Sequence, residues 1–201
     1  ELLMNIANSY LYKDLLVMNE IRRPILLEKL LIALALQVGS EVSYNEVAQT
    51  IGTDNKTVEK YIDLLEKCYV IFRLNAFNRN LRTELKKSKK IYFYDNGIRN
   101  AVIQNFAPLS LRQDTGALWE NFFISERIKA NHYNGNYAKS FFWRTTQQQE
   151  IDYIEEADGN FTAFEMKWNP NKRPITFPSP FLNNYPVKET VVITPENYLE
   201  W

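Results

Sequence analysis

Apolar positions recur with a helical period in the first half of this chain and mostly with a strand period in the second. Leucines repeat at helical spacing over residues 24–39, after a proline suited to a first helical turn. A capping box that starts at Ser43 predicts a second helix ending at Gly52. Thr53 or Asp54 is expected to cap a third helix with its own apolar stripe. The first half is therefore predicted to be helical.

The second half is predicted to combine strands with two further helices. The pattern indicates strands near 69–72, 91–94, 140–144, 149–154, 161–168 and 190–194, and helices near 98–103 and 116–130. The tripeptide Asp158-Gly159-Asn160 is typical of a hairpin turn. A proline-rich stretch over 170–186 separates the last strand from the others. An α+β fold follows from this order.

Composition narrows the class of protein without naming a function. The chain has 201 residues, 45% of them hydrophobic, which is enough to form packed cores. Lys and Arg total 24 and Asp and Glu total 24, so the net charge of zero neither favours nor excludes nucleic acid. Cys68 is the only cysteine, which excludes an internal disulfide and fits a reducing cytoplasm. The longest apolar stretch, Leu30 to Leu36, is too short to span a bilayer, so we expect no membrane association.

One segment departs from this neutral average. Residues 79–90 contain six basic side chains against one acidic side chain, a local charge of +5. The candidates for contact with nucleic acid are Arg79, Arg82, Lys86, Lys87, Lys89 and Lys90. A solvated loop is the plain alternative, because a run of charge is also what an exposed turn carries. If these side chains bind phosphates, the partner of this segment would be DNA or RNA.

The strongest chemical signal comes from charged residues inside two apolar strands. Asp152 interrupts the strand near 149–154, while Glu165 and Lys167 share one face of the strand near 161–168. Charges in such strands are costly unless they are paired, hydrated or bound to a metal. Two carboxylates and a lysine at one sheet edge could hold Mg²⁺ and activate water. The plain alternative is an internal salt-bridge cluster.

The element order and these residues resemble the PD-(D/E)xK nuclease superfamily, a restriction-endonuclease-like fold. The resemblance implies that Asp152 and Glu165 bind a catalytic Mg²⁺, with the backbone carbonyl of Met166 as a further ligand. It also implies that Lys167 lies beside the attacking water and that Glu120, from the preceding helix, completes the site. Two departures are visible. Isoleucine replaces the proline of the family name, and the helix after the lysine is short and broken by prolines.

A wider resemblance covers residues 10–195. It rests on Leu11-Tyr12-Lys13-Asp14, Lys90-Ile91-Tyr92-Phe93-Tyr94-Asp95-Asn96-Gly97, Gly116-Ala117-Leu118-Trp119-Glu120-Asn121, Phe142-Trp143-Arg144-Thr145 and Glu150-Ile151-Asp152-Tyr153. These segments are similar to the C-terminal region, a domain of unknown function, of bacterial and archaeal AAA-type P-loop ATPases. The implied partner is an upstream ATPase domain of the same polypeptide, which would bind the ATP. None of the six glycines begins a Walker A motif, so this piece itself is not expected to hydrolyse ATP.

We therefore predict a winged-helix domain over 1–90 and a PD-(D/E)xK-like mixed-sheet domain over 91–201. The helix over 54–67 would be the recognition helix, but it has four acidic and three basic side chains, a net charge of −1. That balance favours packing or protein contacts over a simple DNA role. Trp119, Trp143 and Trp168, three of the four tryptophans, are expected to pack in the core or in a hairpin, which gives no stacking platform for nucleic acid.

The leading functional hypothesis is a nucleic-acid- or substrate-engaging module in the cytoplasm, with a Mg²⁺-dependent phosphodiesterase activity. The alternative is a non-catalytic interaction or regulatory domain that couples the ATPase to a partner through an inactive nuclease-like fold. A winged-helix transcription regulator is the third hypothesis, and the acidic recognition helix counts against it. Arg144 is expected to pair with Glu150 in a structural role.

Overall fold

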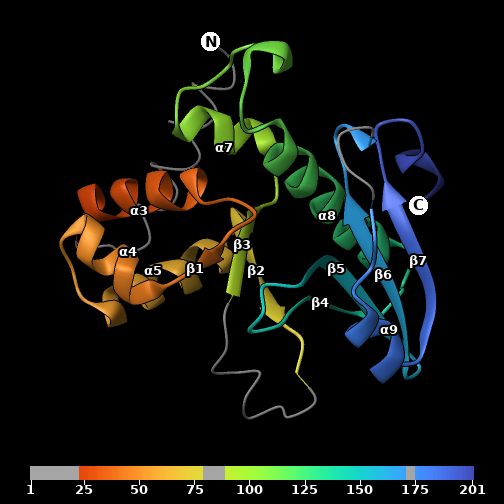
Figure 1. Cartoon of the computed structure of the whole chain (residues 1–201). Helices are drawn as coiled ribbons and strands as arrows, with labels where there is room; N and C mark the ends of the chain where they lie inside the picture. The colour runs from red at the N-terminus through yellow and green to blue at the C-terminus, as the bar shows by residue number, and fades with distance from the viewer. Residues whose placement is uncertain (1–22, 79–88, 171–174) are drawn as a thin grey trace. The chain divides into compact units, whose positions relative to one another are not determined.

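The computed structural model describes residues 23–78, 89–170 and 175–201, and these form a mixed α+β fold (Figure 1). The helices are α3 (Pro24–Leu36), α4 (Tyr44–Ile51), α5 (Asn55–Lys67), α7 (Asn96–Val102), α8 (Thr115–Tyr133) and α9 (Ser179–Asn184). The strands are β1 (Glu41–Val42), β2 (Ile71–Ala76), β3 (Lys89–Phe93), β4 (Lys139–Arg144), β5 (Glu150–Ala157), β6 (Asn160–Met166) and β7 (Val187–Ile193). Hydrogen bonding orders the strands β1-β3-β2-β4-β5-β6-β7. The predicted α+β class is confirmed.

Contacts along the backbone divide the chain into two compact units. Of the described residues, the first unit takes 23–73 and 89–112, and the second takes 74–78, 113–170 and 175–201. Strand β2 passes from the first unit to the second between Arg73 and Leu74. This division differs from the expected boundary at residue 90, because β3 and α7 group with the helices before them.

Local signals fix the helices of the first unit. Pro24 occupies the first turn of α3, where its missing N–H group costs nothing. The Ser43 hydroxyl accepts a hydrogen bond from the Glu46 backbone N–H (3.4 Å) and starts α4. The Asp54 carboxylate does the same for the Thr57 N–H (2.9 Å) and starts α5, so of the two predicted caps Asp54 is the one used.

The strand expected at 69–72 begins later than predicted. Tyr69 has a positive φ of 56° and ends the turn after α5, and the strand β2 runs from Ile71 to Ala76. A tyrosine in the left-handed region is uncommon, and apolar content alone gives no signal for it. The predicted strand was therefore wrong at residues 69 and 70 and right at 71 and 72.

The second unit is built on a four-stranded arrangement with a tight hairpin at its centre. Strands β4, β5 and β6 pair antiparallel, and β7 pairs parallel with β6. The β5–β6 connection is the two-residue turn Asp158-Gly159, with φ angles of 51° and 76°. Positive φ at both central positions is the signature of a type I′ turn, whose twist suits adjoining strands. The predicted hairpin is confirmed.

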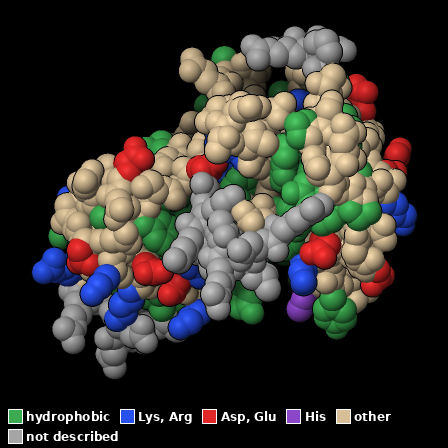
Figure 2. All heavy atoms as spheres, turned by 60° about the horizontal axis from the view of Figure 1, so that its bottom comes forward, with side chains coloured by type: hydrophobic (Ala, Val, Ile, Leu, Met, Phe, Trp, Pro, Cys, Tyr) green, Lys and Arg blue, Asp and Glu red, His purple; other side chains and the backbone are tan. Residues whose placement is uncertain are grey.

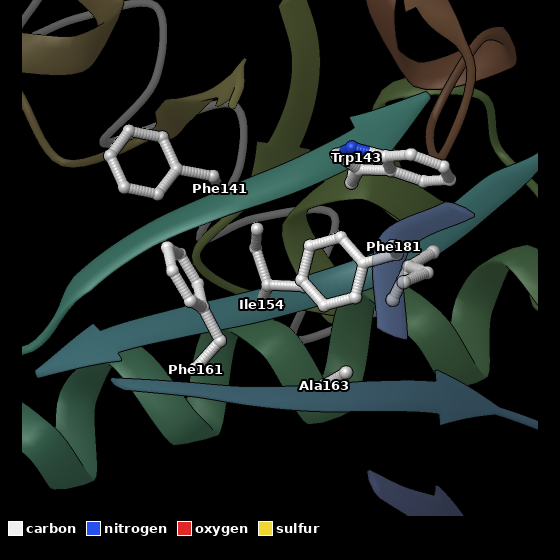
Figure 3. Packing of buried hydrophobic residues seen from close by; sticks show 7 residues of the cluster. Phe141, Trp143, Ile154, Phe161, Ala163 and Phe181 are labelled. Carbon is white, nitrogen blue, oxygen red and sulfur yellow. The ribbon is translucent and has the colours of Figure 1, made fainter. Parts of the chain in front are cut away.

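Apolar residues on one face of this sheet form a compact cluster under helix α9 (Figure 3). Its buried members are Phe141, Trp143, Ile151, Ile154, Phe161, Ala163 and Phe181. Phe181 comes from α9, the short helix within the proline-rich stretch, and its ring lies 5.3 Å from Trp143 and 5.9 Å from Phe161. Helix α8 packs on β6 through Phe123, whose ring is 5.9 Å from that of Phe164. Because neighbouring strand residues point to opposite faces, α8 and α9 cover different faces of β6.

No helix among the described residues is long and apolar enough to cross a membrane.

We predict that Phe181→Ala lowers the free energy of unfolding by about 3–5 kcal/mol, because it empties the centre of a packed cluster. Phe181 is fully buried, whereas its neighbour Leu182 keeps 39% of its surface exposed. Leu182→Ala is therefore the matched control and should cost much less. Denaturant unfolding measures both, and equal losses would contradict the docking of α9 through Phe181.

Candidate functional site

The pairing of β5 with β6 brings Asp152 and Glu165 together. In this pairing Tyr153 lies opposite Phe164, and Ile154 lies opposite Ala163. The next residues along these antiparallel strands are Asp152 and Glu165, at the point where the pairing of β5 with β4 shifts in register. Like charges in such positions destabilise a sheet unless something compensates them. A positive charge close to the two carboxylates would therefore stabilise the hairpin.

Lys167, the residue directly after β6, places a positive charge beside both carboxylates. Its Nζ atom lies 2.7 Å from Glu165 Oε2 and 3.7 Å from Asp152 Oδ2. The backbone N–H of Met166 donates a hydrogen bond to Asp152 Oδ2 (3.1 Å). The backbone N–H of Lys167 donates a hydrogen bond to the carbonyl of Ile193 on β7 (2.8 Å). Three of the four residues predicted from the sequence thus lie within one hydrogen-bonded group.

Burial changes the acid–base properties of this group. Glu165 is only 8% exposed, and desolvation together with the neighbouring charge of Asp152 raises its pKa from 4.5 to about 7. The hydrogen bond from Lys167 acts in the opposite direction and is the smaller effect. Near neutral pH, the Glu165 carboxyl is therefore poised between its charged and neutral forms.

Glu120 contributes at longer range, from helix α8. Burial lowers the pKa of Lys167, but the charges of Asp152, Glu165 and finally Glu120 outweigh it and raise that pKa. Lys167 consequently stays protonated. Glu120, the fourth predicted residue, belongs to the electrostatic surroundings of the lysine.

Glu165 and Lys167 of this charged group open onto a surface pocket of about 640 Å³ in the second unit, whereas Asp152 is not part of its wall. Glu165, Met166 and Lys167 form part of its wall. The remaining wall residues come from the start of α8, from β5 and from the chain after β6: Gln113, Thr115, Gly116, Glu150, Trp168, Asn169, Ile175 and Thr176. A molecule in this pocket would meet both a carboxylate and an ammonium group.

The described residues include no group of three or more His, Cys, Asp and Glu side chains placed to hold a metal ion. Asp152 and Glu165 remain a two-carboxylate pair, the set that the PD-(D/E)xK resemblance assigns to the metal. The further oxygen ligand named by that resemblance is the Met166 backbone carbonyl.

Two structural expectations from the sequence have clear outcomes. Arg144 pairs with Glu150, at 3.5 Å between Nε and Oε2, so that prediction is confirmed. Trp119 and Trp143 are buried at 7% and 6% exposure, as expected. Trp168 is not a core residue, because 39% of its surface is exposed and it lines the pocket. A residue immediately after a strand can point to either side of it, so strand periodicity does not predict whether Trp168 is buried.

The predicted nucleic-acid-binding segment is described only in part. Arg79, Arg82, Lys86 and Lys87 lie outside the described residues. Lys89 places its ammonium 5.2 Å from the centre of the Tyr44 ring, a cation–π contact. Lys90 is 2% exposed, and such burial counts against contact with an external phosphate.

Helix α5 has a different charge balance than its sequence indicates. Arg73 on β2 binds Asp63 (2.8 Å) and forms two further contacts with Glu66, so both acids are used inside the first unit. On the face drawn in Figure 2, basic and acidic side chains of the described residues are interspersed. Among the described residues, that face shows no large patch made of basic side chains alone, which is what favours strong binding to DNA.

Sequence comparison divides the chain in a similar way to the contacts. Residues 2–109, more than half of the chain, match the family described as "Domain of unknown function (DUF8612)". The chain belongs to the DUF8612 family. Residues 115–199 match a second family, "Domain of unknown function (DUF4143)". Asp152, Glu165, Lys167 and Glu120 all fall within this second match.

Several curated proteins share parts of this sequence. An uncharacterized protein of Mycobacterium tuberculosis is 28% identical over 131 residues, which is 64% of this chain and 29% of that protein. An uncharacterized protein of Methanocaldococcus jannaschii is 29% identical over 106 residues, 49% of this chain and 22% of that protein. An uncharacterized Bro-N domain-containing protein of Acanthamoeba polyphaga mimivirus is 28% identical over 116 residues, 57% of this chain and 56% of that protein. The chain spans less than a third of the first two relatives. No solved structure matches significantly.

The raised pKa of Glu165 predicts a specific pH dependence of stability. The folded chain keeps this carboxyl protonated up to about pH 7, whereas the unfolded chain releases the proton near the ordinary value of 4.5. The stability that this proton provides is present below pH 4.5 and is lost as the pH rises to about 7. The free energy of unfolding of the wild type, relative to Glu165→Gln, should therefore fall across that window. Asp152→Asn removes one cause of the shift and should reduce the fall, and identical profiles for wild type and Glu165→Gln would contradict the assignment.

Proposed function

We propose that this chain is the C-terminal nucleic-acid- or substrate-engaging module of an AAA-type ATPase, and that Asp152, Glu165 and Lys167 form a Mg²⁺-dependent phosphodiesterase site. One observation carries the proposal. The Lys167 ammonium reaches both carboxylates, at 2.7 Å and 3.7 Å, at the wall of an open pocket. A cation and two carboxylates at one point is what metal-assisted hydrolysis of a phosphodiester needs.

The chemistry of the donor set fits Mg²⁺. Asp152 and Glu165 supply hard carboxylate oxygens, and the Met166 carbonyl would supply another. The pKa of about 7 at Glu165 means that a second negative charge beside Asp152 is unfavourable. A bound divalent cation would reduce this repulsion. When bound, such an ion stabilises charge on a phosphate and lowers the pKa of a bound water.

The side chains have separable tasks in this proposal. Lys167 stays protonated because three acidic residues surround it, so its ammonium can stabilise an attacking hydroxide or a phosphate oxygen. Asp152 is held in place by the Met166 N–H, which fixes the direction of its second oxygen. Glu120 acts through the lysine, by favouring its charged form.

The order of elements supports the finer fold assignment. In the first unit, α3-β1-α4-α5-β2-β3 with the strand order β1-β3-β2 agrees with a winged helix. In the second unit, α8 is followed by the antiparallel strands β4, β5 and β6 and then by β7 parallel to β6. That arrangement agrees with a PD-(D/E)xK-like domain whose acidic pair lies on its central hairpin.

The proposed ATPase partner rests on length and on family. The Mycobacterium and Methanocaldococcus relatives are each more than three times as long as the segment they share with this chain. The resemblance of residues 10–195 to the C-terminal region of AAA-type ATPases, with which the second family match overlaps, supports the same partner. The upstream domain of the same polypeptide would bind the ATP.

A second function is favoured by the ion pairs themselves. Lys167 already compensates both carboxylates, and no three-ligand metal group occurs among the described residues. A non-catalytic interaction or regulatory domain that retains a nuclease-like fold would have these properties. Such a domain would couple the ATPase to a partner without cutting it.

Cleavage of labelled DNA and RNA with Mg²⁺ or Mn²⁺ separates the two functions. Asp152→Asn and Lys167→Met should each lower the cleavage rate at least about 100-fold, the typical cost of removing one preorganised charged contact in a catalytic site. Glu156→Gln changes another acid of β5, outside the pocket wall, and should leave the rate unchanged.

Cleavage that survives both site variants would overturn the site assignment. An inactive wild type, without any metal-dependent cleavage, would favour the non-catalytic function.

A further inference from the structure

Trp168 lies partly exposed on the wall of the pocket. It directly follows Lys167 in the chain and lines the same pocket as Lys167 and Glu165. With 39% of its surface exposed, it differs from Trp119 and Trp143, which are buried. A partly exposed indole on a pocket wall offers a flat aromatic surface to a ligand.

The indole of Trp168 rests on a fixed aromatic base. Its ring lies 5.8 Å from that of Trp119 at an interplanar angle of 62°, an edge-to-face contact. Trp119 in turn donates its indole N–H to the Ile193 carbonyl (3.2 Å) and packs against Tyr198 at 5.4 Å. A side chain supported in this way loses little conformational entropy when a ligand binds, which favours affinity.

The charges around the pocket do not attract a phosphate by themselves. One lysine, Lys167, faces two acids, Glu150 and Glu165, and Arg144 pairs with Glu150 at 3.5 Å. The other polar groups of the wall are neutral amides and hydroxyls. A polyanion that enters must therefore gain affinity from contacts other than charge, and aromatic stacking supplies such contacts.

We propose that Trp168 stacks on the base of an unpaired nucleotide, so that the substrate class of this site is single-stranded nucleic acid. The pocket volume of about 640 Å³ lies within the range of small-ligand sites and leaves room for one nucleotide. A base inside a duplex is covered on both faces by its neighbours and offers no face to the indole. The catalytic consequence rests on the proposed phosphodiesterase function, whereas binding does not.

The test measures binding without any divalent metal, so cleavage plays no part in it. Fluorescence anisotropy of a labelled oligothymidylate gives the dissociation constant for the 201-residue chain and its variants. Trp168→Ala should weaken binding about 5- to 140-fold, the usual effect of losing one stacked base. Trp168→Phe keeps a ring and should retain most of the affinity. Tyr137→Ala removes an aromatic residue that is 92% exposed and outside the pocket wall, and should change nothing.

A second arm needs no substitution in the protein. An oligonucleotide with abasic sites keeps its phosphates but lacks bases, so the wild type should bind it as weakly as Trp168→Ala binds the normal strand. The matching duplex should also bind weakly. Thermal unfolding of each variant establishes that the compared proteins are folded.

Equal affinity of the wild type for normal and abasic strands would overturn the proposal, as would a preference for the duplex or an unchanged affinity of Trp168→Ala. Trp168-dependent binding by a chain that never cleaves would support this inference while the phosphodiesterase proposal fails. Cleavage without any dependence on Trp168 would show the reverse.

Discussion

The antiparallel pairing of β5 with β6 is the constraint on which the candidate site depends. It brings Asp152 close to Glu165 near one end of the hairpin, where both side chains are largely buried. A cation or a proton on one of the carboxyls makes that arrangement favourable, and Lys167 supplies a cation from the end of the same strand. The type I′ turn at Asp158-Gly159 fixes the register, since a slip by one residue would turn every side chain to the other face. Turn chemistry and site chemistry are therefore linked.

The same arrangement accounts for both functions under consideration. A lysine that compensates two carboxylates holds the site together when no ligand is present. The pKa of about 7 at Glu165 indicates that this compensation is incomplete. A divalent cation or a substrate phosphate would then compete for charges that the protein has already brought together. Whether the chain performs catalysis depends on how much of the lysine's interaction such a ligand can replace.

Sequence reasoning predicted the parts of the site that local rules control. Period-two alternation placed Glu165 and Lys167 on one face, and the Asp-Gly turn predicted the hairpin that carries them. Predictions that needed tertiary contacts were less successful. The burial of Lys90 and the exposure of Trp168 both depend on which elements pack nearby, and strand periodicity does not contain that information. The charge of α5 is a similar case, because Arg73, which binds two of its acids, lies beyond the helix in the chain.

The organisation into two units gives the site a clear boundary. All of the pocket wall and all four predicted catalytic residues belong to the second unit, which coincides with the second family match. The first unit, with its own core and its own internal ion pairs, lies mostly within the DUF8612 match, which also includes residues 74–78 of the second unit. The chemistry proposed for the second unit therefore requires no residue of the first.

Calorimetric titration of Mg²⁺ into the chain near pH 7, in buffers that differ in ionisation enthalpy, tests the central claim most directly. If Asp152 and Glu165 hold the ion, binding should be saturable and should release protons, because the Glu165 carboxyl, with a pKa of about 7, is partly protonated beforehand. Asp152→Asn should abolish both the binding and the proton release. An absence of saturable binding, or binding that is unchanged in Asp152→Asn, would contradict the account.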